Sequence, residues 1–312
     1  MLLHHPPVHR RFLVGITVMA ACETGDPPPG NRESVEPNIE FVEPQEFRRT
    51  GYLQAPGLNE SSGVAASRQH AGLLWTHNDS GDEAVLYLTN LEGDDLGKLA
   101  LEGARARDWE DVTLGPCPTG GSDCLYIADT GDNNQAHSQA RIYVVREPAA
   151  VPLEDTSSAQ AWHINIYYPD RPFNIEAIAA SPMGDLWMIS KGLADTAIFV
   201  FRVNRSDLTQ ETIHLKPLVR LDFDPAPALG QLVTGAAISP DGKTLVARTY
   251  TQIFFYEIVG AELRRTAACW LGHREPQGEA VDFLNDELLV LTSESEAGHL
   301  APISVVSCAG PS

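Results

Sequence analysis

Five residues with oxygen-bearing side chains recur at the first position of a repeated segment. The segment reads SGVAAS (62–67), EDVTLG (110–115), EAIAAS (176–181), TGAAIS (234–239) and EAVDFL (279–284). The shared position holds Ser62, Glu110, Glu176, Thr234 and Glu279. If the fold gathers these copies, three ionised carboxylates raise one another's pKa by repulsion, and a bound divalent cation removes that conflict. The alternative is a water-filled, hydrogen-bonded channel with shifted glutamate pKa values.

The ligand types at this position favour calcium. Ca²⁺ takes roughly six to eight oxygen ligands with tolerant geometry, whereas Mg²⁺ requires a tighter octahedron. Neither His nor Cys occupies the shared position, which disfavours zinc and copper. The sequence therefore predicts an axial Ca²⁺ site.

Short apolar runs separated by Gly, Asp, Asn and Pro must position these residues. Each copy is followed by a second run (LLWTHND, CLYIADT, DLWMISK, TLVARTY, ELLVLTS), a third, and in four units a plausible fourth. This phased repeat predicts an all-β chain folded as a five-bladed β-propeller, whose first strands line the axis. Six blades are possible if residues 134–172 contain a degenerate blade. A many-stranded β-sandwich would leave the phasing unexplained.

The segment EFRRTGYLQAP (46–56) has no partner in its own part of the sequence. The last unit lacks a fourth strand. We expect this N-terminal segment to supply that strand and close the ring, which would remove an open sheet edge.

Five charged residues end the second strands and are expected on one rim: Asp79, Asp129, Lys191, Arg248 and Glu294. One hypothesis is hydrolysis, in which a metal polarises a phosphoryl or acyl oxygen and orients water. Asp79 or Asp129 would be the general base, and Lys191 and Arg248 would stabilise negative charge. Both aspartates also suit plain turns, because Asp caps its own backbone. The two cations could instead pair with the axial glutamates.

The stretch ARDWEDVTLG (106–115) concentrates three carboxylates around one tryptophan. Glu110 belongs to the repeated column and is expected to face the cation. Asp111 has the opposite pleat phase and is expected to point away from the axis. Asp108 precedes the aligned strand, so a turn or rim position is expected, and Trp109 should pack between blades.

The N-terminus resembles that of an exported lipoprotein. Two arginines precede the short apolar run FLVGITVMAA (12–21), and Met19-Ala20-Ala21-Cys22 resembles a bacterial lipobox. We expect residues 1–21 to be a signal peptide, Cys22 to carry the lipid, 22–45 to be a Pro-rich acidic tether, and 46–312 to be the propeller. An ordinary signal peptide cut near Ala20-Ala21 is the alternative.

Charge and cysteine count narrow the environment. The net charge of −20 argues against binding nucleic acid or an anionic membrane surface. After Cys22, four cysteines remain, and an even number in an exported chain suggests disulfides. We expect Cys117 to pair with Cys124, and Cys269 with Cys308.

The predicted axial set resembles that of the calcium-activated nucleotidase (apyrase) family, five-bladed propellers with a central Ca²⁺ held by one residue per blade. The resemblance covers residues 58–294 and implies that the five column residues are the metal shell. The hairpin LWTHNDSGDEAVLY is also similar, but that family's Asp-containing nucleotide motif is not found before Ser62. DWED, DTGDN, SPDG and QGEA resemble a group of exported bacterial propellers without established activity. Calcium-dependent phosphotriesterases and gluconolactonases are more remote analogies.

Three functional classes follow. The first is a Ca²⁺-dependent hydrolase of phosphoester, nucleotide or lactone substrates. The second is a non-catalytic binding propeller with a structural Ca²⁺, and the third is an envelope scaffold. The expected partners are a small anionic ligand or an envelope protein, with the membrane reached through lipid on Cys22. The chain is expected to be an extracytoplasmic monomer.

Overall fold

The structure is a computed structural model that describes residues 41–154, 157–192, 197–223, 226, 228–296 and 299–308. The predicted signal peptide, Cys22 and the tether up to residue 40 lie outside the described residues. Within the described part, no helix has the length and apolar character needed to cross a membrane.

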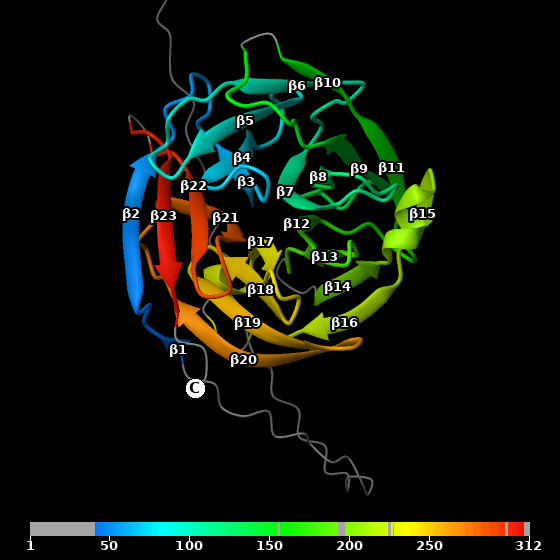
Figure 1. Ribbon diagram of the computed structural model, residues 1–312. Helices are drawn as coiled ribbons and strands as arrows, with labels where there is room; N and C mark the ends of the chain where they lie inside the picture. Colours follow the sequence, from blue (N-terminus) through cyan, green and yellow to red (C-terminus); the bar gives the residue numbers. More distant parts are fainter. Residues whose placement is uncertain are drawn as a thin grey trace, which may run out of the picture. The chain divides into compact units, whose positions relative to one another are not determined.

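Five antiparallel sheets surround a common axis, so the predicted five-bladed propeller is confirmed (Figure 1). Blade one contains β3 (Ser61–Ala66), β4 (Leu73–Asn78), β5 (Val85–Asn90) and β6 (Lys98–Glu102). Blade two contains β7 (Trp109–Pro116), β8 (Asp123–Asp129), β9 (Gln139–Arg146) and β11 (Trp162–Tyr167). Blade three contains β12 (Ile175–Ala180), β13 (Leu186–Ser190), β14 (Ile198–Val203) and β16 (Pro217–Leu221).

Blade four contains β17 (Val233–Ile238), β18 (Thr244–Thr249), β19 (Gln252–Val259) and β20 (Glu262–Trp270). Blade five contains β21 (Gln277–Phe283), β22 (Leu289–Glu294), β23 (Pro302–Ser307) and β2 (Glu46–Tyr52). Two short 3₁₀ helices, η1 (Arg205–Thr209) and η2 (Ala228–Gln231), lie in connections. Residues 134–172 supply β9, β10 and β11 to blades one and two, so they do not form a sixth blade.

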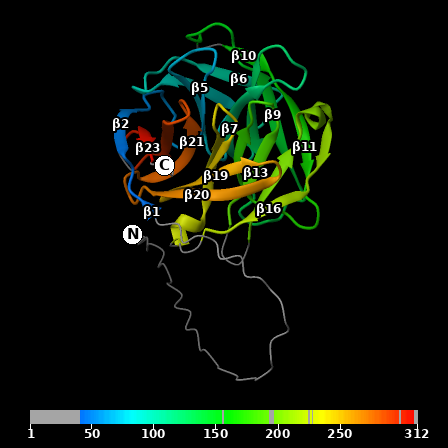
Figure 2. The same ribbon diagram turned by 60° about the horizontal axis from the view of Figure 1, so that its bottom comes forward.

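The N-terminal strand closes the ring as predicted. β2 pairs antiparallel with β23, from Glu46 opposite Ser307 to Tyr52 opposite Pro302. Figure 2 shows β2 at the outer edge of this blade beside β23. The last blade thus combines strands from both ends of the described chain, and its edge is paired rather than open.

Short parallel strands extend three other blades. They are β1 (Phe41–Val42) on β20, β10 (Ser158–Gln160) on β6, and β15 (Thr212–His214) on β11. β1 lies inside the predicted tether, so strand structure begins a few residues before the expected boundary at residue 46. Both β10 and β15 come from the next blade along the chain, and they therefore link consecutive blades.

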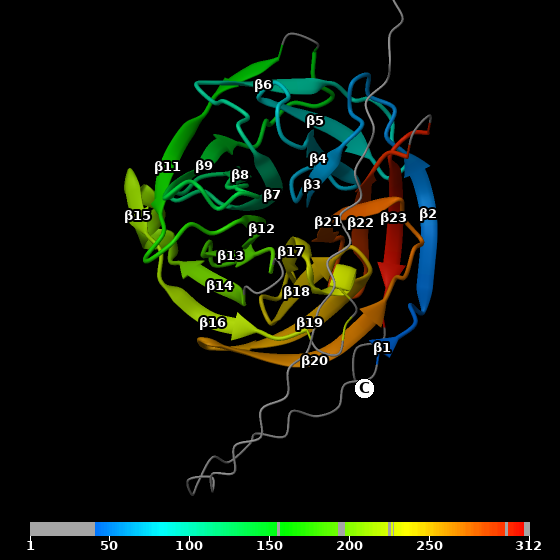
Figure 3. The same cartoon turned by 180° about the vertical axis from the view of Figure 1, so that it is seen from behind.

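The inner strands β3, β7, β12, β17 and β21 form a closed ring in which each packs against two others (Figure 3). This close approach requires small residues: a Cβ at Gly235 would lie 2.8 Å from the carbonyl oxygen of Glu279. Asp111 also joins this ring, because its buried carboxylate accepts the backbone N–H of Ile178 in blade three at 3.0 Å. The Asp111 carboxylate therefore links blade two to blade three through a hydrogen bond.

Apolar side chains fill the space between neighbouring blades. Trp75 and Trp109 share one buried cluster between blades one and two, and Trp187 lies in another between blades three and four. The indole of Trp109 also meets the ring of His77 edge-on at 5.5 Å. The expected packing role of Trp109 is confirmed, and because Trp75, Trp109 and Trp187 are all buried, none of these three rings is free to stack on a ligand.

Both predicted disulfides are present, Cys117–Cys124 and Cys269–Cys308. The first closes a loop inside blade two. The second joins β20 of blade four to the residue after β23 in blade five. Two disulfides indicate an oxidising, extracytoplasmic compartment.

We expect the disulfide between blades to contribute more stability than the one within blade two. Its sequence separation is 39 residues, against 7 for Cys117–Cys124. The chain-entropy model assigns about 4 kcal/mol to the longer loop and about 2.5 kcal/mol to the shorter. Urea denaturation of Cys269→Ala/Cys308→Ala and Cys117→Ala/Cys124→Ala variants measures both. An equal or larger loss from the short loop would contradict this ranking.

Candidate metal centre

A β-bulge occurs at the same place in the inner strand of every blade. The register of the first two strands shifts between Ser61 and Gly63, and at the corresponding point of the other four blades. The residues left unpaired are Ser62, Glu110, Glu176, Thr234 and Glu279, the five members of the predicted column. A bulge re-aims the extra residue and is typical of strands next to functional sites. All five side chains are buried, with 2–6% exposed.

The two hydroxyls of this column bond to the neighbouring blade. Ser62 Oγ donates to the carbonyl oxygen of Glu110 at 2.6 Å, and Thr234 Oγ1 donates to that of Gly278 at 3.1 Å. Each hydroxyl oxygen keeps lone pairs. Their hydrogen bonds therefore fix the blades and leave an acceptor on the oxygen.

The three glutamates have few neutralising partners. Glu176 accepts from the Lys191 ammonium at 2.8 Å and from Asn174 Nδ2 at 2.5 Å. Glu279 accepts from Gln277 Nε2 at 2.9 Å. Within the described part of the chain, Glu110 has no ion pair with a basic side chain, and Lys191 pairs with Glu176 instead.

Burial is the largest cause that raises the pKa of each glutamate. It raises the pKa of Glu110 well above the usual value, with repulsion from Glu176 next. The pKa of Glu176 is also raised by burial, although Lys191 opposes the shift. Burial raises the pKa of Glu279 to about 8, and repulsion from Glu176 adds to this. A cation at this place would favour the ionised forms instead.

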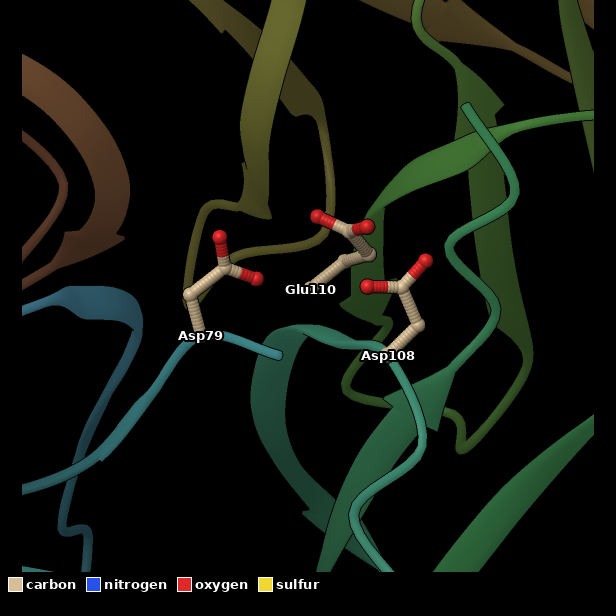
Figure 4. A group of neighbouring side chains, drawn as sticks. All are labelled: Asp79, Asp108 and Glu110. Atoms are coloured by element: carbon tan, nitrogen blue, oxygen red, sulfur yellow. The ribbon is translucent and has the colours of Figure 1, made fainter. Parts of the chain in front are cut away.

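Three carboxylates from blades one and two gather at one end of the column. Figure 4 shows Asp79, which follows β4, facing Asp108 and Glu110 at the start of β7. One oxygen of each lies within 4.8 Å of the others. Glu110 is buried, whereas Asp79 and Asp108 are partly exposed. The rim position expected for Asp108 is therefore the one found, and the cluster connects the buried column to solvent.

The sequence DTGDN (129–133) surrounds these acids. Asp129 Oδ1 accepts the backbone N–H groups of Arg107 and Asp108, at 3.2 and 2.9 Å, and so positions Asp108. Gly131 leaves room, because a side chain there would collide with the carboxylates of Asp108 and Glu110. Asn133 Oδ1 accepts from Asn174 Nδ2 at 3.1 Å, and Asn174 also contacts Glu176.

The predicted rim residues therefore occupy different environments. Asp79 has a carboxylate oxygen within 4.8 Å of one on Glu110, and Lys191 pairs with Glu176. Asp129 holds the backbone before β7 in the way expected of a turn carboxylate, and Glu294 accepts a hydrogen bond from Gln277 Nε2. Lys191 pairs with Glu176, as the ion-pair alternative expects, and burial of this pair keeps the ammonium close to the axis.

Arg248 requires a correction, because it has no exposed surface to offer a ligand. Its side chain is 0% exposed and pairs with buried Glu275 at 2.5 Å. It also donates to the carbonyl oxygens of Ala280 and, at 3.1 Å, Thr292. These carbonyls belong to the register pair that follows the Glu279 bulge. We therefore assign Arg248 to the joint between blades four and five.

Sequence reasoning missed Asn174 and Gln277, which contact Glu176 and Glu279. Both lie two residues before a column residue, as does Asp108 before Glu110. Aligning this second position across the repeat gives polar side chains in four of five copies: Glu60, Asp108, Asn174 and Gln277, with Leu232 as the exception. That pattern was available in the sequence.

Without metal, the protein should lose stability as pH rises. The folded-state pKa of Glu279, about 8, exceeds the ordinary value of 4.5, so the folded protein holds an extra proton between these pH values. Its contribution is complete below about pH 4.5 and is lost as pH rises through about 8. Glu110 and Glu176 shift in the same direction. Thermal melting against pH should therefore slope downward, and Glu279→Gln should flatten the slope.

The exposed Glu257, paired with Arg264, provides the control, because Glu257→Gln should leave the slope unchanged. A melting temperature of the metal-free protein that rises between pH 5 and 8 would contradict the assigned electrostatics, to within about one pH unit.

Comparisons with known proteins find distant structural likenesses but no family. No protein-family model matches the chain. No curated protein sequence matches it either. The PQQ-bound aldose sugar dehydrogenase from Streptomyces coelicolor is 13% identical with a TM-score of 0.46, covering 85% of this chain and 99% of that one. A luciferin-regenerating enzyme is 12% identical with a TM-score of 0.48, covering 84% and 95%. The calcium-binding protein regucalcin from Agrobacterium tumefaciens is 13% identical with a TM-score of 0.47, covering 87% and 98%. At these identities and scores, none of the three assigns a ligand or an activity to this chain.

Proposed function

We propose that this propeller binds one Ca²⁺ ion at the end of its axis where Glu110 meets Asp79 and Asp108. The observation that carries the proposal is the set of five equivalent bulges, which turn one oxygen-bearing side chain per blade into the same buried column. Burying several carboxylates is costly unless a positive charge compensates them. One lysine, Lys191, pairs with Glu176 and leaves most of this negative charge uncompensated.

Calcium suits this donor set better than other common metals. The available donors are carboxylate and hydroxyl oxygens, which are hard ligands. They come from different strands at unequal depths, and Ca²⁺ accepts such irregular shells. In this assignment Glu110 is the central ligand. Asp79 and Asp108 bind from the solvent side, and Glu176 and Glu279 bind or balance charge from within.

We further propose that the propeller is held at the outer side of a bacterial membrane through lipid on Cys22. The lipobox-like Met19-Ala20-Ala21-Cys22 supports this, as do the two disulfides. Labelling with a radioactive fatty acid tests it, because Cys22→Ala should abolish incorporation.

Calcium should stabilise the protein, and the axial glutamates should be required for this effect. At about one hundred times the Kd, bound Ca²⁺ adds about 2.7 kcal/mol, which raises the melting temperature by roughly 5 °C. Glu110→Gln should remove this response. The same substitution should raise the melting temperature in metal-free buffer, because it deletes a repelled, buried carboxylate.

These opposite effects separate a metal ligand from a residue needed only for folding. Glu257→Gln is the matched control and should keep the full calcium response. An unchanged melting temperature of the parent protein in excess Ca²⁺ would refute the calcium site.

Hydrolysis is the second candidate function, favoured by the partial exposure of Asp79 and Asp108 beside buried Glu110. A cation held there is open to solvent on one side, and when bound it supplies Lewis-acid polarisation of a phosphoryl or acyl oxygen. Asp79 lies at the exposed edge, where it can accept a proton from attacking water. The protonated Lys191 lies on the other side of Glu176 and adds positive charge.

If the protein is a hydrolase, Asp79→Asn should lower turnover at least about 100-fold, the usual contribution of a general base. The assay uses a phosphomonoester, a phosphodiester, a nucleotide and a lactone with Ca²⁺ present. Asp82→Asn, in the same exposed hairpin, is the control. If the protein binds calcium but turns over none of the four substrates, these hydrolytic activities are excluded and the calcium-binding function alone is supported.

A further inference from the structure

A pocket of about 230 Å³ opens beside the acidic cluster and is lined by three arginines. The lining residues are Arg105, Arg107, Asp129, Gln139, Ala140 and Arg141. All three arginines are exposed. None of them figured among the residues that the sequence pattern singled out.

Fixed backbone positions these arginines around the end of β8. Arg141 on β9 lies directly opposite Asp129 in the strand register. Arg107 Nη2 donates to the carbonyl oxygen of Asp129 at 3.3 Å. Arg105 precedes β7, and its carbonyl oxygen accepts from the buried indole of Trp109 at 3.3 Å. The three arginine side chains therefore project from neighbouring backbone positions that hydrogen bonds and strand pairing hold in place.

The charge of this pocket is unusual for the protein. The chain has a net charge of −20, and elsewhere arginines such as Arg202, Arg264 and Arg274 pair with carboxylates. In the described part of the chain, the side chains of Arg105 and Arg141 make no hydrogen bond or ion pair. Asp129, the one acid in the lining, is 2% exposed and has one oxygen bonded to two backbone N–H groups. Three guanidinium groups thus face solvent against one enclosed carboxylate.

We propose that this pocket binds the phosphoryl group of a small soluble ligand. Guanidinium groups present planar pairs of N–H donors that match phosphate oxygens. Several guanidinium groups together bind a doubly charged phosphate more tightly than they bind a singly charged carboxylate. The negative charge of the whole chain disfavours nucleic acid as the source of the phosphate. The pocket stands on its own contacts, and it adds a ligand class to the proposed calcium site.

The position of the pocket gives the ligand a defined neighbour. Arg107 and Asp108 are consecutive, and Asp129 Oδ1 holds the backbone N–H of both. The Asp108 carboxylate belongs to the cluster with Asp79 and Glu110. Consecutive residues therefore join the arginine pocket to the proposed cation site.

Calorimetric titration tests the pocket, with phenyl phosphate, inorganic phosphate and phenol as probes. The buffer is freed of divalent metals on a chelating resin, because EDTA is itself an anion that would compete. We expect saturable binding of phenyl phosphate and of inorganic phosphate, and none of phenol. The variant Arg105→Gln/Arg141→Gln should bind about 100-fold more weakly, since each of the two lost charged hydrogen bonds is worth about one factor of ten.

Arg220→Gln, at an exposed arginine on β16, is the matched control and should bind as the parent does. Arg141→Lys is the second variant, because it keeps the charge but loses the paired donors, and it should also weaken binding. Equal affinity of the parent and the double variant, or binding of phenol as tight as phenyl phosphate, would overturn the proposal. The calcium-induced rise in melting temperature should be unchanged in the same variants. The phosphate pocket and the calcium site are therefore tested independently.

Discussion

The desolvation of acidic side chains on the propeller axis is the constraint on which the rest of the site depends. Glu110, Glu176 and Glu279 are buried close enough to repel one another, and burial outweighs every other influence on their pKa values. A protein that keeps such groups must either hold them protonated or supply positive charge. Lys191 supplies part of that charge to Glu176. The negative charge that Lys191 leaves uncompensated is the basis of the proposed cation site at the open end of the column.

The propeller fold brings the repelling carboxylates together and also supplies the interactions that hold them in place. Each blade contributes one bulged residue, so five separate chain segments must be held in register for the column to form. Bonds between blades provide that register, from Asp111 to Ile178 and from Ser62 to Glu110, and the pairing of β2 with β23 closes blade five. Interactions distributed around the whole ring therefore oppose the electrostatic repulsion between the axial glutamates. The folded ring tolerates this repulsion because its destabilising effect is shared among the blades.

The phased repeat made the fold and the five column residues predictable, because both depend on a local pattern copied in every blade. The disulfides were predictable on other grounds: Cys117 and Cys124 flank a short turn-rich loop, and Cys269 and Cys308 are then left to pair. Arg248 could not be placed in this way: it ends a second strand just as Lys191 does, yet blade five offers it buried Glu275 and free carbonyls. Its direction depends on the neighbouring blade, about which its own repeat carries no information. Asn174 and Gln277, by contrast, lay in an alignable position.

The arginine pocket shows how residues outside the repeat acquire a role. Arg105 and Arg107 lie in a connection, and Arg141 lies on a third strand, so no column unites them. Asp129 does so by holding the backbone before β7 and facing Arg141 across the sheet. The same carboxylate positions Asp108 for the acidic cluster. One buried aspartate thus sets a basic surface and an acidic surface side by side. Because neighbouring opposite charges suit a ligand that carries both a phosphate and a bound metal ion, the proposed phosphate pocket and the proposed calcium site would together suit such a ligand.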